Sequence, residues 1–92
     1  MQSTAWVPTE RAERYAKQLV SHLGRHDNRR DNDAGEPVLD FTAGSCVVVA
    51  EPEGVRLTAE AADAEQLAVV EDVIARHLIR FGEKDELTVT WS

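Results

Sequence analysis

The residues of this chain whose side chains could do chemistry are three histidines and one cysteine. His77 lies in EDVIARHLIRFG (71–82), at the edge of an apolar helical stripe. An imidazole at such an edge can bury its ring and bond a backbone carbonyl, or it can face a pocket as an acid, base or ligand. We favour a core role for His77, because the sequence shows no carboxylate placed to orient it as a catalytic base.

His22 and His26 are four residues apart, a spacing that can hold one divalent metal ion on a continuous helix. Gly24 lies between them and is typical of a helix end, which would break that geometry. Two ligands also need a third partner, which the spacing does not supply. We therefore predict no specific metal site, with His22 and His26 as weak candidates.

Cys46 follows the turn-like AGS (43–45) and opens the apolar run CVVVA (46–50). A catalytic thiol needs a lowered pKa from a neighbouring base or a helix N-terminus, and neither is visible in the sequence. A buried, unreactive thiol is the favoured interpretation, so we predict no catalytic residue and lean toward a protein that is not an enzyme. A thiol enzyme or redox protein that uses Cys46 with His22 or His77 stays open as an alternative.

Two helices and four strands are expected to position these residues. The first helix should begin after Thr9 as N-cap and end near Gly24, and the second should begin at Asp63, with Gln66 completing a capping box, and end at Gly82. Alternating apolar residues predict strands at 38–42, 46–50, 55–60 and 87–91. The charged segment 25–37 shows no period and is interpreted as a mobile loop.

The EPEG turn (51–54) predicts a hairpin that places Cys46 near Ala59 and Val48 near Leu57, on the core face. The same register places Val47 and Val49 on the opposite face. Two valines there are either ordinary strand formers or the centre of a homodimer contact. We favour the first interpretation, and we expect a monomer or a weak homodimer.

These elements predict an α+β fold in the order α-β-β-β-α-β. The expected architecture is a two-layer sandwich in which both helices cover one face of a four-stranded mixed sheet. A helical crossover precedes the last strand, so it should run parallel to the first strand and lie beside it. The chain should form a single domain over residues 1–92.

Composition excludes several classes of partner. The chain has 92 residues, of which 42% are hydrophobic, and a net charge of −7, which should repel nucleic acid and anionic membranes. The single cysteine excludes an internal disulfide, and no run approaches the roughly 18–20 apolar residues of a membrane span. The N-terminal residues lack the features of a secretory signal. We expect a cytoplasmic protein without a cofactor.

Three long stretches resemble a family of short bacterial proteins known as domain of unknown function 2218. They are VPTERAERYAKQLVSHLGRH (7–26), LDFTAGSCVVVAEPEGVRLTAEAAD (39–63) and VIARHLIRFGEKDELTVTW (73–91). The most specific parts lie around Arg14 and Tyr15, at Gly44-x-Cys46, around His77 and Arg80, and at Trp91. The chain departs from the family pattern at His26 and at 82–84, which weakens any role assigned there.

The resemblance implies a compact α/β domain and no defined activity. It also implies an association with flavin-dependent siderophore-interacting proteins, and so with iron or siderophore handling. It directs attention to His22, Cys46 and His77, which with Arg80 are the candidate ligand-binding residues. We expect a non-catalytic binding or accessory protein, and the thiol enzyme and the homodimeric interaction module are the two alternatives.

Overall fold

The structure is a computed structural model, and it describes residues 1–24 and 28–92. The described part forms one five-stranded sheet in the order β1-β5-β4-β3-β2, in which every neighbouring pair is antiparallel. The α+β class predicted from the sequence is confirmed, but the sheet has five strands rather than four and is not mixed. The elements are β1 (Gln2–Pro8), α1 (Ala12–Leu23), β2 (Arg29–Asp31), β3 (Pro37–Asp40), β4 (Gly44–Glu51), β5 (Gly54–Ala61), α2 (Ala64–Phe81) and a 3-10 turn, η1 (Glu83–Asp85).

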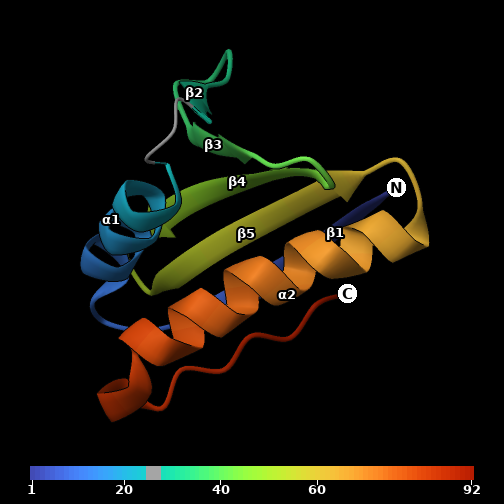
Figure 1. Cartoon of the computed structure of the whole chain (residues 1–92). Helices are drawn as coiled ribbons and strands as arrows, with labels where there is room; N and C mark the ends of the chain where they lie inside the picture. The colour runs from blue at the N-terminus through green and yellow to red at the C-terminus, as the bar shows by residue number, and fades with distance from the viewer. Residues whose placement is uncertain (25–27) are drawn as a thin grey trace.

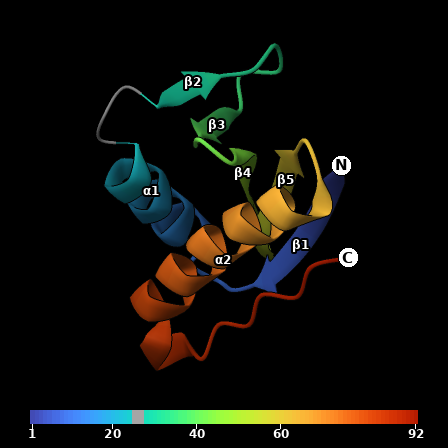
Figure 2. The same ribbon diagram turned by 45° about the vertical axis from the view of Figure 1, so that its right-hand side comes forward.

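Both helices pack against the same face of the sheet, and α2 runs diagonally across it (Figures 1 and 2). Side chains alternate along each strand, so every second residue of β1, β4 and β5 faces the helices. One core therefore joins the helix stripes to the inner face of the sheet, and its largest fully buried members are Leu19, Leu39, Leu57, Ile74 and Leu78.

The β4–β5 hairpin has the predicted register. Cys46 lies opposite Ala59 and Val48 lies opposite Leu57, and all four are almost completely buried. A two-residue turn joins Glu51 to Gly54. The alternation of apolar and polar residues allows only one register that buries the apolar set. The hairpin lies inside the sheet, with β1 beyond β5 and β3 beyond β4.

The N-terminal strand β1 is absent from the sequence prediction. It pairs with β5 along its whole length, and Ser3, Ala5 and Val7 point inward in strict alternation. Ser3 is buried but satisfied, since its hydroxyl donates to Glu71 Oε2 of α2 at 2.7 Å. The sequence contains the two-residue alternation of a strand. However, two of the three inward residues are small or polar, and such a strand has a weak hydrophobic signal.

The C-terminal segment lies beside β1 and not beside the 38–42 strand, as had been expected for 87–91. It makes an isolated antiparallel bridge between Ala5 and Trp91, with two backbone hydrogen bonds between Thr4 and Ser92 at 2.9 and 3.1 Å. It therefore runs in the same direction as β5, as a helical crossover requires, but β1 lies between the two. The predicted direction holds, but residues 87–91 form only this bridge rather than a strand, and the predicted neighbour is wrong.

The two helix starts differ in how well the sequence predicts them. Asp63 caps α2 as expected, because its Oδ1 accepts from the Gln66 N–H at 2.8 Å. Thr9 is not the N-cap of α1: the helix begins at Ala12 after Arg11, and the Thr9 hydroxyl accepts from the Arg11 N–H at 3.1 Å. A short threonine turn therefore precedes the helix and delays it by two residues.

The sequence predicts an irregular loop over 25–37, but part of that segment has regular structure. β2 pairs with β3, and the turn between them is organised by Asn32, whose Oδ1 accepts from the N–H groups of Ala34 and Glu36 at 3.0 and 2.9 Å. Gly35 has φ of 77° in this turn, a conformation that favours glycine. Residues 25–27 lie outside the described part of the chain.

Candidate functional site

His77 is half-buried on α2, and one of its two ring nitrogens is committed to the backbone. Its Nδ1 lies 2.7 Å from the carbonyl oxygen of Val73, one turn earlier in the helix. A carbonyl oxygen can only accept, so Nδ1 carries a hydrogen and donates it. In the neutral ring this leaves Nε2 with a free lone pair. The backbone contact expected of a core histidine is therefore present. The same contact leaves the Nε2 lone pair to accept a hydrogen bond or to coordinate a metal ion.

His22 of α1 meets this ring where the two helices approach each other. The His22 and His77 ring centroids are 5.4 Å apart at an interplanar angle of 46°. Phe81, one turn after His77, presents its ring to His22 in a T-shaped contact at 5.3 Å and to His77 at 6.3 Å. We call these three residues the histidine cluster. It places an exposed imidazole, a half-buried imidazole and an apolar ring side by side.

The remaining candidate ligands do not complete this cluster into a closed metal centre. Within residues 1–24 and 28–92, no three histidine, cysteine or carboxylate side chains are grouped so as to hold an ion. Arg80 lies in the last turn of α2, is exposed, and takes part in none of the ion pairs found among the described residues. His26 lies outside the described residues.

Cys46 is separated from solvent. Its side chain is fully buried on the inner face of β4, and its Sγ lies 3.6 Å from the carbonyl oxygen of Val47. Burial raises the pKa of the Cys46 thiol to about 12, and a backbone hydrogen bond from Thr58 offsets only part of that effect. The thiol is therefore protonated at neutral pH, as predicted for a core cysteine, and this argues against the thiol-enzyme alternative.

A second polar cluster, which the sequence did not indicate, links the start of α1 to η1. The Tyr15 hydroxyl donates a short hydrogen bond to Asp85 Oδ2, and Arg11 reaches both carboxylate oxygens of Asp85 at 3.0 Å. The Tyr15 bond is the main cause that holds the pKa of Asp85 below its usual value, with Arg11 and Arg14 adding to it. The signal available in the sequence was Tyr15 itself, because a buried phenol needs a polar partner.

Replacing Tyr15 with phenylalanine should make the stability of the domain less sensitive to acid. A carboxyl whose folded pKa is lowered contributes stability above its unfolded pKa of about 3.9, and this contribution is lost as pH falls through the folded pKa. Urea unfolding at pH 7 and pH 2.5 should show a gap between wild type and Tyr15→Phe that narrows at the lower pH. Asp85→Asn is the control that removes the titrating group. An equal gap at both pH values would contradict the assignment.

The outer face of the sheet is partly covered by charged side chains. Val47 and Val49 are only partly exposed, and Val38, which lies opposite Val47, is 2% exposed. Arg56 covers the Trp6 ring at 5.4 Å and pairs with Glu51 through a 2.5 Å Nε–Oε2 contact. The apolar area left in this face is small, which supports the interpretation of the two valines as ordinary strand residues.

Comparisons with known proteins place the chain among bacterial relatives without a known role. Residues 4–92 match the family described as "Uncharacterized protein conserved in bacteria (DUF2218)", which confirms the predicted resemblance. The NMR structure of PA4090 from Pseudomonas aeruginosa superposes with a TM-score of 0.75 at 30% sequence identity, over 99% of this chain and 94% of that one. None of the curated proteins compared matches the chain. Over the described residues, neither helix has the length and apolar character required to cross a bilayer.

Proposed function

We propose, for a chain that belongs to the DUF2218 family of uncharacterised bacterial proteins, a non-catalytic role in which His22 and His77 bind a divalent transition-metal ion. The observation that carries the proposal is the convergence of the two imidazoles at 5.4 Å, with His77 Nδ1 bonded to the Val73 carbonyl. Sequence spacing alone pairs His22 with His26. The fold instead offers His77 as the second ligand.

The ring separation fits two ligands on one ion. With a metal–nitrogen distance of about 2.1 Å and a tetrahedral angle, two imidazole centroids lie about 5.2 Å apart. The His22–His77 separation of 5.4 Å is close to this value. The Val73 carbonyl supports His77 in the way that outer hydrogen bonds support metal-bound histidines, by holding the ring orientation and leaving Nε2 as the ligand atom.

The chemistry of the cluster favours carriage of a metal over catalysis with it. Two protein ligands leave several coordination positions to water or to a small chelator, so the ion would be held loosely and exchanged easily. Imidazole suits Fe²⁺, Ni²⁺, Cu²⁺ and Zn²⁺. Among these, Fe²⁺ is the ion that fits the proposed link to iron or siderophore handling. A flavin-dependent siderophore-interacting protein, as the proposed partner, would release iron in this reduced form.

Calorimetric titration tests the site directly. Ni²⁺, Zn²⁺ and, without oxygen, Fe²⁺ should bind with one equivalent per chain and a dissociation constant below about 100 μM, which is about −5.5 kcal/mol. His22→Ala and His77→Ala should each weaken binding at least tenfold. Ser21→Ala, an exposed neighbour on α1, is the matched control.

Two results would overturn the proposal. The first is the lack of saturable binding below about 100 μM for all three ions. The second is binding that His26→Ala abolishes and His77→Ala leaves unchanged. That pattern would place the ion on His22 and His26, which their spacing makes only weak candidates, rather than on the His22–His77 pair.

A further inference from the structure

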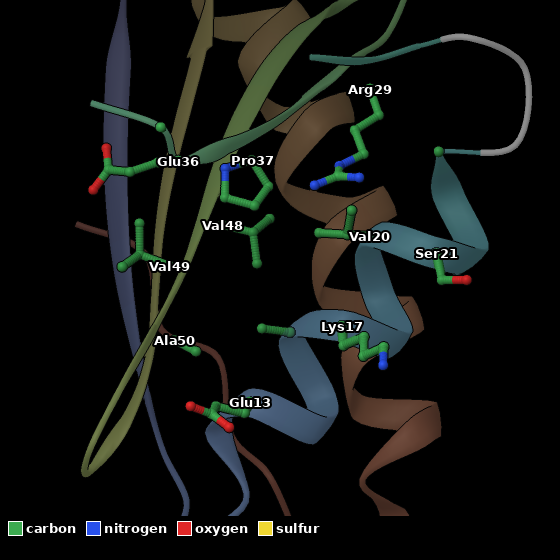
Figure 3. Close-up of a pocket in the computed structure, with 13 residues that line it drawn as sticks. Glu13, Lys17, Val20, Ser21, Arg29, Glu36, Pro37, Val48, Val49 and Ala50 are labelled. Atoms are coloured by element: carbon green, nitrogen blue, oxygen red, sulfur yellow. The ribbon is translucent and has the colours of Figure 1, made fainter. Parts of the chain in front are cut away.

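A groove lies between α1 and β4, and its lining contains none of the three residues of the histidine cluster. It has a volume of about 830 Å³, and Figure 3 shows Val20 of α1 facing Val48 of β4 across it, with Pro37 at one end. A second hollow of about 670 Å³ shares Glu13 and Ala50 with the first and continues it toward the β4–β5 turn. We call the two together the α1–β4 groove.

The groove exposes an unpaired edge of β4. Along its full length β4 pairs with β5, but among the described residues it pairs with β3 only over Ser45–Val47. The edge at 48–51 therefore continues past the end of β3. Open strand edges of this kind can accept an added strand through main-chain hydrogen bonds.

At this edge of β4, backbone N–H and carbonyl groups point to the β3 side, where an added strand could pair with them. Gly44 exchanges hydrogen bonds with Phe41 at 2.7 and 3.2 Å, so its backbone groups face the β3 side. In an antiparallel ladder every second residue faces the same neighbour, so Val48 and Ala50 face that side too. Pro37 lies next in the register, opposite Val48, and has no N–H to donate. Because Pro37 already occupies the position opposite Val48, the N–H and the carbonyl of Ala50 are the backbone groups left for a partner.

Charge gives the groove two different ends. At the Pro37 end, the Arg29 guanidinium lies between Pro37 and Val20 in Figure 3. Its ion pair with Asp31 is long, 3.6 Å, and both side chains are more than half exposed, so the pair is weak and the guanidinium can bind another anion. Two nearby charges point elsewhere, since the Lys17 ammonium and the Glu36 carboxylate are directed away from the groove (Figure 3).

The opposite end of the groove is acidic. Glu10 and Glu13 line it, and Glu13 extends toward β4 near Ala50 (Figure 3). The two arginines at this end both act on Asp85: Arg11 is bonded to it, and Arg14 lowers its pKa through charge. The carboxylates of Glu10 and Glu13 are in no ion pair among the described residues, so this end favours a cation. Glu51 also lines it but is paired with Arg56.

From the open edge and the two charged ends we infer that the α1–β4 groove binds an extended peptide that ends in a free carboxylate. A peptide in line with β3 and antiparallel to β4 has its C-terminus at Pro37, where Arg29 can bind the carboxylate. A peptide parallel to β4 would instead bring its carboxylate to Glu13. Charge thus selects the antiparallel direction, which is also the direction of β3.

The register of that peptide predicts its sequence pattern. Pro37 occupies the position opposite Val48, so a four-residue peptide in line with β3 lies opposite residues 49–52, with its C-terminal residue opposite Val49. The residue opposite Ala50 points toward α1 and should be apolar, because Ala16, Val20 and Val48 line that part of the groove. The residue two positions earlier points the same way, near Glu10 and Glu13, and should be basic. The intervening residues face away and are free to vary.

The probe that matches this pattern is acetyl-Lys-Thr-Val-Thr with a free C-terminal carboxylate. Titrated into ¹⁵N-labelled protein with a chelator present, so that metal binding plays no part, it should shift the Ala50 amide resonance saturably below about 1 mM. The same peptide with a C-terminal amide should bind about tenfold more weakly, because the charged hydrogen bonds to Arg29 are lost. Arg29→Gln should weaken the carboxylate peptide equally and leave the amide peptide unchanged.

Three further variants separate edge pairing from simple filling of the groove. Arg30→Gln, the neighbour of Arg29 on the opposite face of β2, should leave binding unchanged. Ala50→Pro removes an N–H that the β5 ladder does not use and should abolish binding, whereas Ala50→Ser should retain it. The inference is overturned if the Ala50 amide does not respond, or if the acid and amide peptides bind equally to wild type.

Discussion

Replacing Ile74 with alanine should destabilise the domain by about 3 kcal/mol, within the range of about 2–5 kcal/mol for such a change in a packed core. Ile74 is fully buried at the contact between α2 and the sheet. A domain of this size has a total stability of about 5 kcal/mol, so more than half of it would be lost. The melting temperature should fall by about 12–24 °C.

The matched control is Ile79→Ala, because Ile79 lies five residues later on the same helix and is 44% exposed. The difference in helix propensity between isoleucine and alanine is the same at both positions, so the comparison isolates burial. Urea unfolding followed by circular dichroism should show a loss below about 1 kcal/mol for this variant. Equal losses at the two positions would mean that α2 presents a different face to the sheet.

The parts of the fold that the sequence predicts are those whose signals are local. Asp63 and Gly82 bracket α2, and the alternation around the EPEG turn allows one register for β4 and β5. The sequence does not predict β1, because Ser3 and Ala5 give the inner face of this strand little hydrophobic signal. The position of the C-terminal segment depends on β1: without β1 the sequence predicts Trp91 beside the 38–42 strand, whereas in the structure Trp91 bridges to Ala5 of β1.

The site shows the same division between local and long-range information. The sequence singled out His22 and His77 separately, but their contact depends on how α1 and α2 approach each other, which no spacing within one helix encodes. Arg29 lies in the charged segment 25–37, where acidic and basic residues alternate, so the sequence does not single it out. Only the pairing of β2 with β3 brings it to the end of the α1–β4 groove.

Cys46 should react with an alkylating agent at least 1,000-fold more slowly in the native protein than in the unfolded chain at pH 7.5. With a pKa of about 12, very little thiolate forms in the folded state, whereas an unfolded cysteine with a pKa of about 8.5 is about one-tenth ionised. The sulfur is also fully buried, so reagent reaches it only after the domain opens. Opening that costs about 5 kcal/mol exposes about one molecule in 5,000.

Mass spectrometry of timed iodoacetamide reactions measures this protection, and the core variants give it an internal check. If labelling requires global opening, Ile74→Ala should accelerate it about 100-fold, since each 1.4 kcal/mol changes the open population tenfold, and Ile79→Ala should change it little. A native thiol that is alkylated as fast as a free cysteine would contradict the burial of Cys46. It would also restore the nucleophile that a thiol-dependent enzyme requires, because only a reachable thiolate can attack a substrate.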